Sequence, residues 1–181
     1  LKWSDLEASS TVRRLLSNPI MRGFLFSYVL YVFTWQSTAA FLPAYFELGK
    51  GFDATTAKVA FGLLFASGMI SKPSAGFITS WIPRKLLIPG VLSLSACALV
   101  GIIFVTSPLP ALVLVGCFGI FLMAFPPLMQ SLLMDKFPND STGGDLGAFR
   151  SVYIGIGALG PTYVGAVTRI ASYATAFFGM V

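Results

Sequence analysis

Long runs of apolar residues, separated by short polar turns, constrain this chain more than any other feature of its sequence. The first run, from Gly23 to Phe46, contains no charged residue. A helix needs about 20 apolar residues to cross the hydrocarbon core of a bilayer. The runs are continuous rather than alternating, which favours helices over strands, and a helix satisfies its own backbone hydrogen bonds inside lipid. The pattern therefore predicts an all-α membrane protein.

The composition agrees with a chain that is embedded in a membrane. Hydrophobic residues make up 56% of the 181 residues and charged residues only 10%, whereas a soluble domain has about 25% charged residues. The Lys and Arg residues lie mostly at the ends of apolar runs, without the basic stripe and interleaved aromatic residues of a nucleic-acid-binding surface. We therefore expect the lipid bilayer as a partner and no nucleic acid.

The residues that flank the apolar runs indicate where the helices begin and end. Asn18 followed by Pro19 is typical of a helix start, and Asp53 is a typical N-cap residue. We expect residues 1–22 to end a central cytoplasmic loop and residues 23–181 to form one transmembrane helical domain. Its spans are expected at about 23–46, 54–82, 86–106, 110–134, 146–168 and 172–181. Because the chain starts at Leu1 and its last apolar run stops at Val181, we expect a fragment whose sixth helix is truncated.

The distribution of positive charge predicts the orientation of these spans. Cytoplasmic loops of membrane proteins carry an excess of Lys and Arg. With the amino terminus in the cytoplasm, nine of the 12 Lys and Arg residues fall inside, and only Lys50, Lys58 and Arg169 fall outside. We therefore expect a multi-pass protein of the cell membrane whose amino terminus is cytoplasmic.

The turn between the second and third runs carries the most specific motif. It reads Gly76-Phe-Ile-Thr-Ser-Trp-Ile-Pro-Arg84-Lys85. This stretch is similar to the loop signature of the major facilitator superfamily, in which a glycine is followed by three residues, an acid, a base and then a basic pair. Gly76, Arg84 and Lys85 match the signature. Ser80 and Trp81 stand where an acid and a base are usual, which weakens the case for charge-based gating.

Three further stretches extend the resemblance over essentially the whole chain. Phe41-Leu-Pro43-Ala-Tyr45 resembles the outer end of helix seven of the superfamily, residues 125–150 resemble the end of helix ten and the next loop, and residues 155–165 resemble helix eleven. Their order is similar to the carboxy-terminal half of the superfamily. The resemblance implies half of a twelve-helix fold, a missing amino-terminal half as partner, and transport of a small-molecule solute by alternating access, either actively coupled or facilitative, without a cofactor.

Lys72 is a basic residue well inside an apolar run. A cation at the centre of a bilayer costs about 2.5–3.5 kcal/mol on insertion scales, so such a residue is a candidate for function. One hypothesis is that Lys72 contacts an anionic substrate. The other is that its long stem snorkels to headgroups or water. Pro73, which follows it, is expected to bend the helix.

One face of the first run carries aromatic rings and hydroxyl groups at helical spacing. Its residues are Tyr28, Tyr31, Trp35 and Thr38. The resemblance implies that helix seven lines the central cavity, where such a face can hold a ligand by stacking and hydrogen bonding. Packing against neighbouring helices or lipid is the alternative. Gln36 and Gln130 are polar residues that need partners in the membrane, either a substrate or another helix.

The fifth span is rich in small residues, which let helices approach closely. These residues are Gly155, Gly157, Gly160 and Gly165, with Pro161 as an expected bend. We expect them to serve helix packing rather than substrate contact. Arg150 begins this span. It is a candidate gating residue together with the basic pair. Its side chain is expected to pair with Asp135 or Asp145, to cap carbonyls of a neighbouring helix, or to serve as a plain cytoplasmic anchor.

Catalytic and metal functions are not expected. Ala66-Ser67-Gly68 faintly resembles the serine motif of rhomboid proteases, but such a serine needs a base, usually His, and the chain contains no His. The absence of His and of a Cys cluster also argues against a zinc site. A non-catalytic six-span channel or assembly subunit is the alternative to a transporter, although neither a filter loop nor a charged ring is evident.

Overall fold

The computed structural model describes residue 13 and residues 16–134 and 142–181. Over these residues the chain is helical apart from short turns and contains no strand, which confirms the all-α fold class. The helices are α2 (Pro19–Ala44), the π-helical turn η2 (Tyr45–Gly49), α3 (Ala54–Ile78), α4 (Arg84–Phe104), α5 (Pro108–Met134), α6 (Thr142–Gly157), α7 (Leu159–Ile170) and α8 (Tyr173–Phe178). The expected cytoplasmic segment 1–22 lies mostly outside the described residues.

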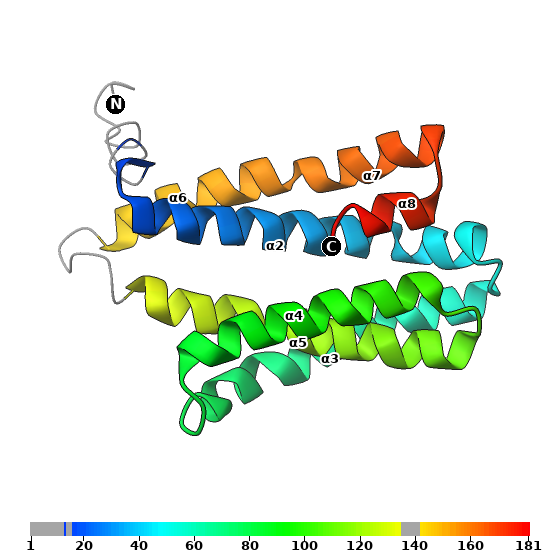
Figure 1. The fold of residues 1–181 in the computed structure, drawn as a ribbon, viewed down its shortest axis with the longest axis horizontal. Helices are drawn as coiled ribbons and strands as arrows, with labels where there is room; N and C mark the ends of the chain where they lie inside the picture. Colours follow the sequence, from blue (N-terminus) through cyan, green and yellow to red (C-terminus); the bar gives the residue numbers. More distant parts are fainter. Residues whose placement is uncertain (1–12, 14–15, 135–141) are drawn as a thin grey trace.

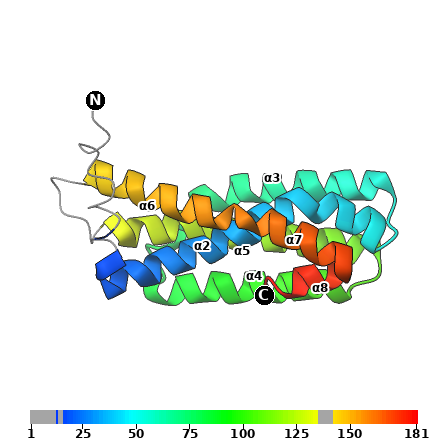
Figure 2. The same cartoon turned by 90° about the horizontal axis from the view of Figure 1, so that it is seen from above.

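Successive long helices run in opposite directions and form two layers (Figure 1). One layer contains α3, α4 and α5, in which α5 packs against both α3 and α4. In the other layer, α2 packs against α6 and α7. The two layers join where α2 meets α3 and α5 and where α8 meets α4. Figure 2 shows the same bundle from above, with the starts of α2 and α6 at one end and the turn between α7 and α8 at the other.

Within the part of the chain that the structure describes, four helical segments are long and apolar enough to cross a membrane: Pro19–Gly49, Ala54–Ile78, Arg84–Phe104 and Pro108–Met134. The fifth expected span, residues 146–168, is instead divided into α6 and α7 by a break at Ala158. Pro161 lies one turn after Gly157 and has no N–H to donate to the carbonyl of that residue. This missing hydrogen bond explains why the helix is interrupted just before Pro161.

The turn between α3 and α4 starts earlier than the apolar run suggests. Helix α3 ends at Ile78, before the expected end at residue 82, and α4 begins at Arg84 rather than at residue 86. Ile82 precedes Pro83, and a residue before proline is pushed out of the helical region by a steric clash. Pro83 therefore separates the two helices and places the basic pair Arg84 and Lys85 in the first turn of α4.

Side chains that cap the helices were correctly predicted from the sequence. The Asn18 side chain accepts a hydrogen bond from the backbone N–H of Ile20 at 2.9 Å. Asp53 caps α3 by accepting hydrogen bonds from the Thr56 hydroxyl at 2.6 Å and from its backbone N–H at 3.0 Å. The hydroxyl and backbone donors together hold the pKa of the Asp53 carboxyl below its usual value. The two caps thus set the residues at which α2 and α3 begin.

Lys50 connects the carboxyl end of the first long helical segment to the carboxyl end of α4. Its ammonium donates hydrogen bonds to the carbonyl oxygens of Ile103 at 3.0 Å and Val105 at 2.5 Å. Carbonyls at the carboxyl end of a helix lack backbone partners, and a cation near them is favourable. Burial of the side chain lowers the pKa of Lys50. The Lys50 side chain therefore has a structural role, which is to hydrogen-bond the last carbonyls of α4.

Candidate functional site

A cavity of about 280 Å³ lies between α2, α3 and α5. Its lining combines aromatic rings, thioethers and one ammonium group. The lining residues are Tyr31, Trp35, Phe65, Gly68, Met69, Lys72 and Met123. Three residues that the sequence analysis singled out on two separate spans, Tyr31, Trp35 and Lys72, therefore meet at one cavity.

The α2 wall of the cavity consists of two rings one helical turn apart. Tyr31 stacks on Phe125 of α5 with ring centroids 5.3 Å apart, and its hydroxyl donates to the sulfur of Met123 at 3.7 Å. Trp35 meets the edge of Phe65 of α3, also at 5.3 Å. Both rings are half-buried. Neighbouring helices therefore hold the rings in place while one side of each stays open to the cavity.

The α3 wall follows the spacing i, i+4, i+7 through Phe65, Met69 and Lys72, which places these residues on one helix face. Met69 is 76% exposed, and Lys72 is also exposed. Among the described residues, Lys72 has no hydrogen-bond or ion-pair partner. Gly68, three residues after Phe65, belongs to the same face and also lines the cavity; a Cβ there would stand 2.8 Å from the Met123 side chain. The missing side chain of Gly68 thus makes room for Met123 in the lining.

Tyr28 and Thr38 were expected on the same wall as Tyr31 and Trp35, but the structure places both away from the cavity. Tyr28 is buried in an aromatic cluster, where it stacks on Tyr153 at 4.7 Å and donates its hydroxyl to the carbonyl of Pro126 at 3.3 Å. Thr38 is fully buried. A set spaced i, i+3, i+7, i+10 shares one face but extends about 15 Å along the helix, so its two ends meet different neighbours. Gln36 is half-buried and is not among the lining residues either.

Gln130 and Arg150 contact one another rather than the cavity. The Arg150 guanidinium donates to the side-chain oxygen of Gln130 at 3.5 Å and so links α5 to α6. This contact favours the interhelical role that was one of two hypotheses for Gln130. Of the acidic partners considered for Arg150, Asp145 is buried and Asp135 lies outside the described residues.

The residues of the loop signature lie at the end of the bundle where α2 begins (Figure 1). Gly76 is exposed on α3, with open space where a Cβ would be. Ser80, which takes the place of the usual acid, donates its hydroxyl to the carbonyl of Phe77 at 2.7 Å. The Ser80 side chain therefore makes a hydrogen bond within its own turn, in the position where an acidic side chain would be available to pair with a basic one.

The glycines of the fifth span differ in their surroundings. A Cβ on Gly157 would stand 2.6 Å from the side chain of Val32, and one on Gly160 would stand 2.5 Å from the carbonyl oxygen of Phe33. A Cβ on Gly165 would stand 3.5 Å from the Phe41 ring, which is an ordinary contact distance, whereas a Cβ on Gly155 would enter open space. Close helix approach therefore depends on Gly157 and Gly160, and the expectation of a packing role does not fit Gly155.

Sequence reasoning missed Phe65, Met69 and Met123 as lining residues. The first two share the helical face of Lys72, so their spacing was a usable signal. Met123 is separated from Tyr31 by 92 residues, and no local pattern connects the two.

Comparison with known proteins identifies a family. The family model described as Major Facilitator Superfamily matches residues 2–161, which is most of the chain. No curated protein matches the sequence.

Proposed function

This chain belongs to the major facilitator superfamily of membrane transporters, and we propose that it forms one half of a transporter that moves a small anionic solute by alternating access. The observation that carries this proposal is the exposed ammonium of Lys72 in a cavity walled by Tyr31 and Trp35. A cation within a span needs water, a partner or a ligand to offset its desolvation. An anionic solute group supplies that compensation.

The open side of the cavity is where we place a second, amino-terminal six-helix half. Met69 and Lys72 are exposed there, and Phe65 is 43% exposed. A solute site between two halves of a transporter is closed by the second half and opens to one side or the other as the halves rock. The all-α bundle described above is consistent with one such half. In this arrangement the aromatic rings contact the body of the solute and Lys72 its charge.

Proton coupling would require a carboxylate within the membrane, and the four long helices of the described residues lack one. Helices α2, α3, α4 and α5 contain no Asp or Glu, and carboxylates are the usual proton carriers in membrane transporters. If transport is proton-coupled, we place the coupling carboxylate in the second half. A facilitative mechanism needs none.

Transport by the full-length protein in proteoliposomes tests the proposed function. We expect uptake of labelled organic anions that saturates with concentration and is inhibited by other anions of similar size. Uptake restricted to cations would contradict the role of Lys72. An ohmic ion conductance without saturable uptake would instead support the alternative, a six-span channel.

We propose that the protein lies in the cell membrane with the amino-terminal end of this chain in the cytoplasm, and labelling can test this. Ser107, in the turn before α5, is exposed, and Ser141 belongs to the polar segment before α6. A cysteine at position 107 should react with an impermeant maleimide added outside cells, and a cysteine at position 141 only after permeabilisation. Labelling of both from one side would contradict the topology.

Trp35→Ala should lower transport by roughly two- to tenfold, because an aromatic contact contributes about 0.5–1.5 kcal/mol beyond its buried area. Phe77→Ala is the matched control, since Phe77 is 70% exposed on α3 and does not line the cavity. Initial uptake rates at equal protein per liposome give the comparison. Equal rates for both variants would exclude Trp35 from the solute site.

A further inference from the structure

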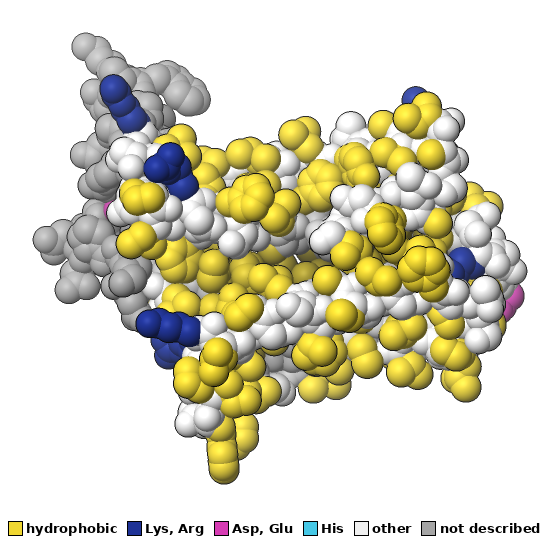
Figure 3. Space-filling model, in the orientation of Figure 1, with side chains coloured by type: hydrophobic (Ala, Val, Ile, Leu, Met, Phe, Trp, Pro, Cys, Tyr) yellow, Lys and Arg dark blue, Asp and Glu magenta, His cyan; other side chains and the backbone are white. Residues whose placement is uncertain are grey.

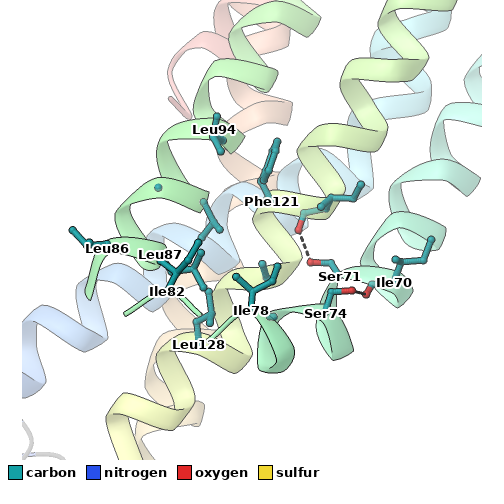
Figure 4. Close-up of a pocket in the computed structure, with 15 residues that line it drawn as sticks. Ile70, Ser71, Ser74, Ile78, Ile82, Leu86, Leu87, Leu94, Phe121 and Leu128 are labelled. Atoms are coloured by element: carbon teal, nitrogen blue, oxygen red, sulfur yellow. Dashed lines mark hydrogen bonds between the residues drawn. The ribbon is translucent and has the colours of Figure 1, made fainter. Parts of the chain in front are cut away.

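An apolar groove of about 330 Å³ lies between α3, α4 and α5 (Figure 4), and Lys72 is not among its lining residues. Helix α3 contributes Ile70 and Ser71 to this groove, whereas Met69 and Lys72 line the candidate solute cavity. Adjacent residues of a helix point about 100° apart, so the two sites use different faces of α3. The groove is therefore separate from the proposed transport site.

The groove is elongated along the helix axes. It extends from Ile70 to Ile78 on α3, from Leu86 to Leu94 on α4 and from Ile120 to Leu128 on α5. At a rise of 1.5 Å per residue, each stretch covers about 12 Å. In a membrane bundle this direction is close to that of the lipid acyl chains, so the shape suits one extended chain.

The two polar side chains in the groove are already hydrogen-bonded to backbone carbonyls. Ser71 donates to the carbonyl of Ile120 at 2.5 Å, and Ser74 donates to that of Ile70 at 2.8 Å, as Figure 4 shows. The remaining lining is aliphatic apart from Phe121. A polar solute would lose its hydration here without gaining partners. The chemistry of the groove thus favours a hydrocarbon chain.

The groove opens sideways and lies beside a pair of positive charges. Leu86 is 68% exposed and Ile82 is 42% exposed at the end where α4 begins. The basic residues Arg84 and Lys85 occupy the first turn of α4 at that same end, and Figure 3 shows basic side chains gathered at this end of the molecule. Basic groups next to an apolar site at the headgroup level are the feature that recognises anionic lipids.

We propose that this groove binds one acyl chain of an anionic phospholipid whose phosphate group lies at Arg84 and Lys85. Filling the groove restores the dispersion contacts that an empty space between side chains lacks. Lipid tails are as apolar as the lining residues, so entry of the chain gives little selectivity among lipids. The two positive charges of Arg84 and Lys85 supply the selectivity, and they favour anionic headgroups over zwitterionic ones.

Native mass spectrometry of the purified full-length protein tests this site. The protein is incubated with equimolar phosphatidylglycerol and phosphatidylcholine of identical chains, and retained lipid is counted. We expect one retained phosphatidylglycerol per protein. Gly90 lines the groove and has open space where a Cβ would be, so Gly90→Leu should fill the groove without a clash and abolish this retention. Gly23→Leu is the matched control, since Gly23 is also a helical glycine with open space at its Cβ position and does not line the groove.

Charge variants test the headgroup contact independently. Each basic residue near the surface contributes roughly a fivefold preference for an anionic lipid, so replacing both Arg84 and Lys85 with Gln should reduce the preference by about 25-fold. Arg22→Gln, at the same end of the bundle, should leave it unchanged.

Three results would overturn the proposal. The first is that Gly90→Leu and the unsubstituted protein retain equal amounts of lipid. The second is that the unsubstituted protein retains the two lipids equally. The third is that a cysteine replacing Leu94 is protected from a membrane-soluble maleimide when no lipid is retained. The last result would mean that another part of the protein covers the groove. None of these measurements depends on transport, so they are separate from the test of the proposed function.

Discussion

Lys72→Met should reduce transport of the anionic solute by about 10- to 100-fold at matched expression. A hydrogen bond to a charged group contributes about 1.5–3 kcal/mol, and each 1.4 kcal/mol corresponds to a factor of ten. Methionine keeps much of the stem of lysine and removes its charge. Because Lys72 has no protein partner among the described residues, its replacement breaks no contact that the fold requires. Insertion and thermal stability should therefore stay unchanged while uptake falls.

Lys58→Met is the matched control for this experiment. Lys58 is an exposed residue of the same helix, and it is not among the residues that line the cavity. Initial uptake rates and solute inhibition constants should be measured for both variants in proteoliposomes. Normal uptake by Lys72→Met would show that Lys72 only snorkels to the membrane surface, and it would remove the main support for an anionic substrate.

Gly160→Val should prevent α7 from packing against α2 and strongly reduce the yield of folded protein. The new Cβ would stand 2.5 Å from the backbone carbonyl oxygen of Phe33 and would also meet the Ser37 hydroxyl. A backbone carbonyl cannot move aside as a flexible side chain can, so the helices would have to separate. Overpacking of this kind typically costs about 1–3 kcal/mol, occasionally more. Thermal unfolding in detergent and size-exclusion profiles measure the effect.

Gly155→Val makes the same chemical change in the adjoining helix α6. Gly155 is exposed and has open space at its Cβ position. The two substitutions have the same effect on intrinsic helix propensity, so a difference between them reports packing alone. We expect Gly155→Val to retain nearly normal stability. Equal destabilisation by both variants would contradict the packing role of Gly160.

The sequence alone determined the fold class, the family resemblance and the approximate positions of the long helices. The long apolar runs and the caps at Asn18 and Asp53 are local signals, and the bilayer demands that each run satisfy its own backbone. Lys72 was also recognisable because a charge inside an apolar run is conspicuous without knowledge of its neighbours. The sequence did not show that Pro161 is accompanied by a full break at Ala158, since proline-containing helices often only bend.

The tertiary structure decided which residues meet. Tyr28 and Tyr31 are both aromatic hydroxyl residues one turn apart, yet one packs against Tyr153 and the other faces the cavity. Met123 joins the site from a helix far away in the sequence. Gly155 and Gly160 likewise differ only in whether another helix passes close by. Such contacts depend on how helices are rotated and spaced against one another, and the local periodicity of a single helix does not contain that information.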